Sequence, residues 1–289
     1  MVALAVKRML PYADVVDAVL AEMGERADPD RWSVVSTGSA HLVIDIDGRI
    51  CVRIAKNPSA RSSLARRTEV LRRLPDYDFA VPRPLSRTHL HRGHAAVGLT
   101  WVQGKHRYGR ADPEQLGRLL EQLWATDVSG FDGFLDRPGQ HWGGHRRRRV
   151  MLDEVVPRLL PRNRDLARQA IAELAELDVV APQLVHSDLM CHNMIWQGEH
   201  LAGVIDWDHA SLGDAAQDVA TLALSFGWQS LARVLPPEIM DRARLHARIV
   251  PMQSVAYTLV QELDTAQVNQ AVARADDWID NRLRALLRR

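Results

Sequence analysis

The sequence LVHSDLMCHNMIW, residues 184 to 196, decides how the rest of this chain is interpreted. Two short apolar pieces flank a polar segment that holds Asp188 and Asn193, five residues apart. A third apolar piece, residues 201 to 205, leads directly into Asp206, eighteen residues after Asp188. We therefore expect a carboxylate, a carboxamide and a second carboxylate at the ends of short strands.

These three side chains have the chemistry that phosphoryl transfer requires. Such a reaction needs a metal ion to neutralise phosphate charge, a group that positions the attacking hydroxyl, and cations on the phosphates. Asp188 is the candidate base for the hydroxyl proton. Asn193 and Asp206 offer the oxygen ligands that suit Mg²⁺. The pattern therefore predicts a phosphoryl-transfer site.

Other polar residues in this region are interpreted as structural. His186 is expected to form a hydrogen bond within the loop and so orient it. Asp208 and Asp218 are expected to brace the loop or cap a helix rather than touch a substrate. His192 and His209 lack a Cys or His partner at ligand spacing, so a zinc site is not expected.

The composition indicates a folded protein. The chain has 289 residues, of which 46% are hydrophobic, and a formal net charge of +1. Such a balance does not indicate a nucleic-acid binder, and two cysteines without a CxxC spacing argue against a disulfide framework. The N-terminus has the wrong order of charge and apolar residues for a signal peptide, and no apolar run could span a membrane. A cytoplasmic protein without a membrane partner is expected.

The N-terminal part has the pattern of an antiparallel sheet. Apolar runs on both sides of Asp47-Gly48 predict a β-hairpin. The small-residue turn before it contains Gly38 and Ser39, whose backbone N–H groups are candidate contacts for nucleotide phosphates. An ordinary connecting loop is the alternative for this turn.

A helix predicted over residues 59 to 74 follows these strands, with Ser59 as its cap. Glu69 is its only acidic residue, and Arg53 lies on the preceding strand. A strand cation paired with a helix acid can hold a nucleotide's phosphates in register, so both are candidate nucleotide-binding residues. An ordinary surface ion pair is the alternative.

The strand pattern ends at Gln103-Gly104, and helical patterns follow. This change predicts an α+β protein with a first lobe at residues 1–104 and a mostly helical second lobe at residues 105–289. Arg146 to Arg149 form a basic cluster that could contact nucleic acid, but the solvated start of a helix is the favoured interpretation.

At this point the chain resembles the aminoglycoside phosphotransferase family, the kinase-like antibiotic and metabolite kinases. The resemblance is carried by His186-Ser187-Asp188 through Asn193, by Ile205-Asp206-Trp207, and by Gly213-Asp214 through Asp218. It covers most of the chain, because the weaker N-terminal signals also occur in the family's order.

The resemblance implies a two-lobed protein-kinase-like fold, with a small antiparallel-sheet lobe and a mostly helical lobe. It implies ATP or GTP as co-substrate, Mg²⁺ as cofactor and a small-molecule hydroxyl as acceptor. The adenine would bond to the backbone near Thr100 and Val102. Asp188 would be catalytic, and Asn193 and Asp206 would hold the metal.

Two positions depart from the family pattern. Ser187 replaces a glycine, which is tolerated if the backbone does not need a positive φ there. The strand cation is usually lysine, whereas Arg53 occupies the matching position, and Arg is not a conservative replacement at a precise phosphate contact. Lys56, three residues later, is the alternative clamp.

The sequence constrains the chemical identity of the acceptor less than it constrains the reaction. An aminoglycoside-like antibiotic, phosphorylated to confer resistance, is favoured because Asn193 is present where the macrolide kinases tend to have histidine. A macrolide or peptide antibiotic, a sugar or amino alcohol, and a degenerate kinase-like module that binds without turnover remain alternatives. Candidate acceptor-side residues are the acids Glu262, Asp264, Asp276, Asp277 and Asp280 and the aromatics Trp142, Trp228, Tyr257 and Trp278.

Overall fold

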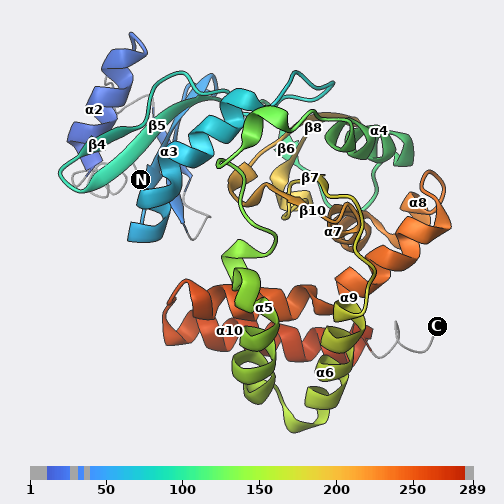
Figure 1. Cartoon of the computed structure of the whole chain (residues 1–289). Coiled ribbons are helices and arrows are strands. Elements are labelled where there is room, and N and C mark those ends of the chain that lie inside the picture. The colour runs from blue at the N-terminus through green and yellow to red at the C-terminus, as the bar shows by residue number, and fades with distance from the viewer. Residues whose placement is uncertain (1–11, 27–31, 36–39, 284–289) are drawn as a thin grey trace. The chain divides into compact units, whose positions relative to one another are not determined.

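The computed structural model describes residues 12–26, 32–35 and 40–283. The chain divides into two compact units, each considered by itself (Figure 1). The first contains the residues up to Arg107 together with Ser129–Phe134 and His192–Asp208, and the second contains Tyr108–Val128, Leu135–Cys191 and the residues from His209 onward. The units are therefore not two consecutive halves of the sequence, because the chain returns to the first unit twice.

The first unit is built on a five-stranded antiparallel sheet with the order β1-β2-β3-β5-β4. Its strands are β1 (Trp32–Val35), β2 (His41–Ile46), β3 (Ile50–Ala55), β4 (His89–His91) and β5 (His94–Thr100). β3 is central, with Val52 and Ile54 fully buried, which explains its nearly continuous apolar sequence. Arg53 is the polar exception in the middle of this strand.

The predicted hairpin between β2 and β3 is confirmed. Asp47 and Gly48 both have positive φ, at 55° and 62°, as a type I′ turn requires. The Asp45 carboxylate accepts a hydrogen bond from the Gly48 N–H at 2.8 Å and holds the turn. The turn sets the register that places Arg53 opposite Val43 on β2.

Two helices pack on this sheet. α2 (Ala13–Glu22) buries Val15, Val16 and Val19 against strand residues that include Ile44 and Val52. These buried residues recur at the spacing of one face of an amphipathic helix.

The second helix, α3 (Pro58–Arg73), does not have the predicted cap. Asn57, not Ser59, caps it, because the Asn57 side chain accepts from the Ala60 N–H at 2.8 Å and Pro58 takes the first helical position. Ser59 lies inside the first turn, where its carbonyl accepts from the hydroxyls of Ser62 and Ser63.

A small second sheet completes the first unit. Its order is β6-β8-β9, formed by β6 (Lys105–His106), β8 (Met194–Gln197) and β9 (His200–Val204). Ala80 joins β9 to the rest of the unit through two backbone bonds, with Ala202 and Val204. The segment that carries Asn193 and Asp206 is therefore tied to the first unit by regular backbone pairing.

The second unit is mostly helical. Its elements are α4 (Pro113–Trp124), α5 (Arg147–Arg149), α6 (Pro161–Ala175), α7 (Ala216–Phe226), α8 (Trp228–Leu231), α9 (Pro237–Val260), α10 (Thr265–Trp278) and the antiparallel strands β7 (Gln183–Val185) and β10 (Ser211–Gly213). Figure 1 shows α9 and α10 side by side, and their interface is filled by buried side chains that include Met252 and Ile279. Among the described residues, no helix is long and apolar enough to cross a membrane.

The turn at Gly104 provides a test of packing in the first unit. Gly104 has φ +135°, and a Cβ there would lie 2.5 Å from the Trp196 carbonyl oxygen. We expect Gly104→Ala to lower the free energy of unfolding by roughly 3 kcal/mol, because both backbone strain and a clash with backbone are introduced. Gly109→Ala is the matched control, since Gly109 has φ +93° with nothing within 4 Å. It should cost only about 1 kcal/mol. Equal losses in urea denaturation would show that the clash at residue 104 is absent.

Candidate active site

The two predicted metal ligands lie in the first unit, at neighbouring ends of β8 and β9. Asn193 directly precedes β8, and Asp206 follows β9 by one residue. The Ile205 N–H donates to the Asn193 carbonyl at 2.9 Å, so the hairpin brings the two segments together. Asn193 is buried, whereas the Asp206 side chain is 46% exposed. A half-exposed carboxylate beside a buried amide is a suitable start for a site that also takes oxygens from a ligand.

Asp206 has an unusual backbone conformation, with φ 63°. A non-glycine residue in the left-handed region costs roughly 1 kcal/mol, and such strain concentrates at functional sites. This observation agrees with the predicted role of Asp206 without testing it.

Arg53 is held by two carboxylates. Its Nη1 donates to Asp208 Oδ1 at 2.6 Å, and its Nη2 donates to Asp206 Oδ1 at 2.7 Å. Burial alone would lower the pKa of the Arg53 guanidinium, but the charges of Asp208 and then Asp206 more than offset this and raise it. Arg53 therefore carries a permanent positive charge next to a candidate metal ligand.

The expected ion pair between Arg53 and Glu69 is wrong. Glu69 pairs instead with Arg72 and Arg73 on its own helix, at 3.3 and 2.5 Å. These residues are three and four positions away on α3, where helical geometry brings them together at little entropic cost. The assignment of Glu69 to nucleotide binding stays a prediction, without the pair that motivated it.

Sequence reasoning missed the residues that replace Glu69 as partners of Arg53. From the sequence Asp208 is expected only as a brace, and Arg67 is not among the candidate residues. In the structure Arg67 Nη1 donates to Asp208 Oδ2 at 2.8 Å, and His41 Nδ1 lies 3.4 Å from the same oxygen. The second Asp in Ile-Asp-Trp-Asp could have identified Asp208 from the sequence. An acid that lies so close to a buried strand needs cationic partners.

The other predicted nucleotide contacts have mixed outcomes. Gly38 and Ser39 lie outside the described residues. The N–H of Thr100 donates to the Arg83 carbonyl, and the Thr100 hydroxyl accepts from the Arg83 N–H. These bonds commit the Thr100 N–H to the protein itself.

Val102 is buried, and its contact with adenine stays a prediction. Lys56 is exposed just beyond the end of β3, whereas Arg53 lies within the strand.

The predicted base lies in the second unit, on the loop that follows β7. His186 is fully buried, and Asp188 is partly exposed. The Asp188 N–H donates to His186 Nδ1 at 3.3 Å, which confirms the expectation that His186 bonds within the loop. The loop thus presents the Asp188 carboxylate while its neighbours are fixed inside the protein.

The carboxylate of Asp218 anchors the backbone of this loop. The His186 and Ser187 N–H groups donate to the two oxygens of Asp218 at 2.7 and 3.0 Å. Asp218 comes from α7 and is completely buried, so the bonds are shielded from water. The expectation that Asp218 braces the loop is confirmed.

The condition set for a serine at position 187 is not met, because the backbone there does adopt a positive φ. Its φ is 67°, so the position requires the left-handed region that favours glycine. The two bonds to Asp218 and a 3.0 Å bond between the Ser187 and Ser211 hydroxyls offset the strain. The serine is therefore tolerated because its surroundings determine the backbone, not because the constraint is absent.

A second carboxylate in this unit organises the start of α7. Asp214 accepts from the Ala216 N–H at 3.0 Å. Its other oxygen accepts from Arg242 at 2.6 Å and lies 2.7 Å from His246 Nε2. Burial alone would raise the pKa of Asp214, but His246, the Ala216 N–H and Arg242 lower it to about 2. Asp214 thus holds the first turn of α7, although Ala215 occupies the cap position.

The acids expected near the acceptor are mostly used by the protein itself. Asp264 caps α10 through the Gln267 N–H. Asp276 is buried and accepts from the Leu160 N–H and the Asn163 amide at the start of α6. Asp280 pairs with Arg162 at 2.7 Å. These contacts explain the acid cluster without a cationic ligand.

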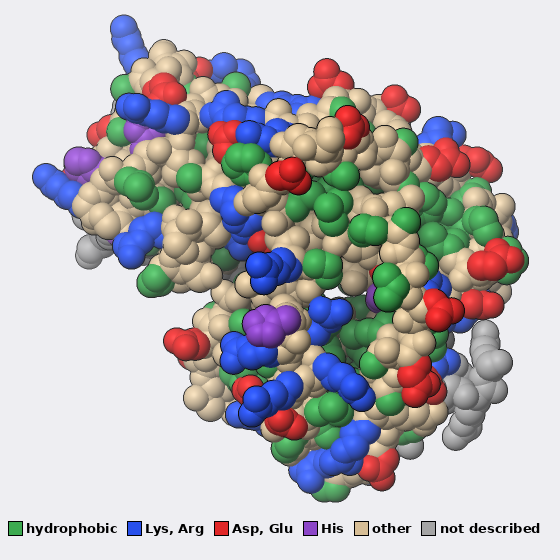
Figure 2. Space-filling model, in the orientation of Figure 1, with side chains coloured by type: hydrophobic (Ala, Val, Ile, Leu, Met, Phe, Trp, Pro, Cys, Tyr) green, Lys and Arg blue, Asp and Glu red, His purple; other side chains and the backbone are tan. Residues whose placement is uncertain are grey.

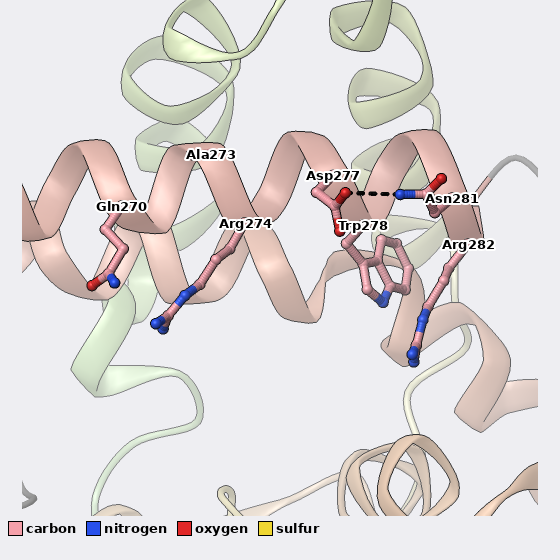
Figure 3. Close-up of a pocket in the computed structure, with 7 residues that line it drawn as sticks. All are labelled: Gln270, Ala273, Arg274, Asp277, Trp278, Asn281 and Arg282. Carbon is pink, nitrogen blue, oxygen red and sulfur yellow. Dashed lines mark hydrogen bonds between the residues drawn. The ribbon is translucent and has the colours of Figure 1, made fainter.

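The aromatic candidates are divided between core and surface. Trp142 is buried in the helical core, and Trp228 lies under the guanidinium of Arg244. Trp278 lines a hollow of about 420 Å³ on α10, where Figure 3 shows it between Arg274 and Arg282. Among the described residues that line this hollow, Asp277 is the only acid, and its carboxylate accepts from Asn281 at 2.8 Å. The described lining therefore does not favour a polycation.

The basic cluster at Arg146 to Arg149 makes local contacts. Arg147 lies over the Trp142 ring at 5.9 Å, and Arg149 pairs with Asp153. On the face shown in Figure 2, Lys and Arg side chains are interspersed with acidic and apolar ones. These contacts agree with the favoured interpretation as a solvated helix start.

The fold and the loop chemistry together define a kinase-like phosphotransferase. Residues 23–248 match the model of the phosphotransferase enzyme family, which covers more than half of the chain. The chain therefore belongs to this family, and it is an enzyme of the phosphotransferase class.

Similar proteins agree with this family. Viomycin phosphotransferase from Streptomyces vinaceus is 28% identical over 214 residues, which cover 68% of this chain and 73% of that protein. Homoserine kinase from Pseudomonas aeruginosa is 40% identical over 117 residues, or 37% of this chain and 34% of that protein. The solved GDP complex of aminoglycoside 2′-phosphotransferase-IIIa superposes with a TM-score of 0.76 at 17% identity, covering 94% of this chain and 98% of that one. The expected two-lobed protein-kinase-like α+β fold is confirmed.

The buried carboxylate of Asp218 predicts a specific pH dependence. Burial raises its pKa to about 6 from an ordinary 3.8, and the His186 ring and the two N–H bonds offset only part of this rise. The folded protein therefore binds a proton more tightly than the unfolded chain. The stabilisation is complete below the unfolded pKa and is lost as the pH rises through about 6.

We expect the free energy of unfolding of the wild type, relative to Asp218→Asn, to fall by roughly 2 kcal/mol between about pH 4 and pH 7. Urea denaturation of both proteins across this range measures the difference. The lost N–H acceptor in the variant adds a constant offset, so only the slope matters. Parallel pH curves for the two proteins would contradict the raised pKa.

Proposed function

We propose that this protein transfers the γ-phosphate of ATP or GTP to a hydroxyl group of a small-molecule antibiotic, and so confers resistance. The observation that carries the proposal is the loop at residues 186–188. Asp218 holds its backbone in a strained conformation while Asp188 stays partly exposed. Strain that is maintained at a partly exposed acid is typical of a catalytic position.

Asp188 accepts the proton of the attacking hydroxyl. Carboxylates in this role need a fixed position more than a strongly shifted pKa, because little covalent chemistry is required of the protein. The buried His186 and Asp218 supply that fixed position. Arg53 supplies positive charge for the phosphates.

Asn193 and Asp206 fit a magnesium ion. Mg²⁺ is commonly bound through one or two protein oxygens, with the rest of its shell coming from water and phosphates. The half-exposed Asp206 carboxylate and the neighbouring Asn193 segment match that requirement. When bound, the ion neutralises phosphate charge during transfer.

The acceptor proposed is a hydroxyl-bearing antibiotic of the peptide or aminoglycoside kind. The similarity to viomycin phosphotransferase spans most of the chain and includes the 28% identity given above. The acids of the C-terminal helices are largely engaged in the fold, which favours an acceptor with fewer ammonium groups than a typical aminoglycoside carries.

A metabolite kinase that acts on an amino alcohol is the second candidate. It is favoured by the 40% identity to homoserine kinase, which is confined to 117 residues. A short, local identity of this kind supports the shared reaction more than a shared acceptor. An acceptor panel therefore needs both antibiotics and amino alcohols.

The proposal is tested with purified protein, Mg²⁺, ATP or GTP, and a panel of peptide antibiotics, aminoglycosides, macrolides, homoserine and related amino alcohols. We expect mass spectrometry to detect a phosphorylated antibiotic, and expression to raise the inhibitory concentration of that antibiotic. A product found only with amino alcohols would select the second candidate. Nucleotide binding without any phosphorylated product would identify a non-enzymatic module.

Substitution of the base is the sharper test. We expect Asp188→Asn to lower kcat by about 10²-fold or more, because the hydroxyl proton loses its acceptor, while nucleotide affinity stays largely intact. Asp165→Asn is a matched control, since Asp165 is an exposed acid on α6 that pairs with Arg168 in its own helix turn. Turnover in the Asp188 variant above a few per cent of wild type would remove this assignment.

A further inference from the structure

We propose that Asp208 is a positioning residue for nucleotide binding, because it anchors one arm of the Arg53 guanidinium while Asp206 is free to exchange its partner. The inference rests on the proposed function and concerns residues of the first unit alone. It assigns to Asp208 the task that was expected of Glu69.

The two arms of the Arg53 fork have unequal partners. Nη1 donates to Asp208, whose side chain is 6% exposed, and Nη2 donates to Asp206, whose side chain is 46% exposed. The distances are nearly the same, at 2.6 and 2.7 Å. The difference therefore lies in solvent access and in the alternatives open to each carboxylate.

Further contacts hold the Asp208 carboxylate in place beside Arg53. Its second oxygen accepts from Arg67 at 2.8 Å and lies 3.4 Å from His41 Nδ1. Arg67 comes from α3 and His41 from β2, so Asp208 is held from a helix and a strand at once. A buried carboxylate that pairs with two arginines, Arg53 and Arg67, is costly to displace.

Asp206, in contrast, can change partners. As a half-exposed candidate metal ligand, it can turn its oxygens toward a cation that arrives with a nucleotide. Nη2 of Arg53 is then released and becomes a donor for a phosphate oxygen, while Nη1 remains on Asp208. The guanidinium stays in place and charged throughout, because it does not lose its proton in proteins.

This arrangement also explains why arginine occupies the strand position. A planar guanidinium offers two donor arms in a fixed geometry, so one arm can stay anchored while the other exchanges. A lysine ammonium is a single point charge and cannot divide its contacts in the same fixed way. The arginine and the second aspartate therefore form a functional pair in this chain.

Glu69 is the competing anchor, and its contacts argue against it. It pairs with Arg72 and Arg73 of its own helix, and its side chain is 38% exposed. If Glu69 were the anchor, its substitution should weaken nucleotide binding more than substitution of Asp208. If Asp208 is the anchor, the order of the two effects is reversed.

The test measures the dissociation constants of ATP, GTP and GDP by isothermal titration calorimetry, with and without Mg²⁺, for wild type, Asp208→Asn and Glu69→Gln. We expect Asp208→Asn to weaken nucleotide binding about tenfold or more and to raise the nucleotide KM, while the acceptor KM changes little. Glu69→Gln should have the smaller effect. The reverse order would return the anchor role to Glu69 and overturn the proposal.

A purely structural role for Asp208 is separated by a double-mutant cycle with Arg53→Ala. If Asp208 acts through Arg53, Asp208→Asn should cost little further nucleotide affinity once Arg53 is absent. Additive losses would show that Asp208 acts independently of Arg53 and would overturn the proposal. Asp76→Asn is the matched control, since Asp76 is fully exposed and also pairs with an arginine, Arg83.

Arg53→Lys keeps the inference testable if Asp208→Asn does not fold. It preserves the charge but removes the fork, and we expect it to weaken nucleotide binding about as much as Asp208→Asn. Wild-type affinity in Arg53→Lys would overturn the proposal. A wild type that binds nucleotide through Arg53 and Asp208 but phosphorylates no acceptor would count against the proposed function only.

Discussion

The site depends on one buried carboxylate, that of Asp218, which accepts hydrogen bonds from two consecutive backbone N–H groups. These bonds hold Ser187 in a left-handed conformation that a serine would otherwise avoid. The loop therefore has a single backbone path, and Asp188 emerges from it at a defined place. The carboxylate is costly to bury, as its raised pKa shows, and the N–H bonds offset part of this cost.

The first unit also contains a buried carboxylate that fixes neighbouring groups, and these groups are arginine side chains. Asp208 is also buried, and it gathers Arg53 and Arg67 from β3 and α3. In each unit a buried acid fixes a group that neighbours a candidate site residue. The candidate base Asp188 and the candidate metal ligand Asp206 are partly exposed, whereas Asp218 and Asp208 are buried.

Much of the fold was predictable from local pattern. The Asp47-Gly48 hairpin and the amphipathic helices depend on neighbouring residues, and the structure has them nearly as expected. The partners of Arg53 were not predictable from the sequence. Glu69 pairs with an arginine of its own helix, and Asp208 is more than a hundred residues away from Arg53 in sequence. Whether Ser187 has a positive φ was left open by the sequence, since residue type alone does not determine the backbone conformation.

The sequence by itself determined which residues are the candidates for the chemistry. The spacing of Asp188, Asn193 and Asp206 specifies the loop and strand ends on which they lie, because short-range patterns set strands and turns. Only the tertiary structure decided which charges meet and which acids are available. Ion pairs form between groups that packing brings within reach, so the engagement of Arg53 by Asp208, and of Asp276 by the start of α6, could be known only from the folded chain.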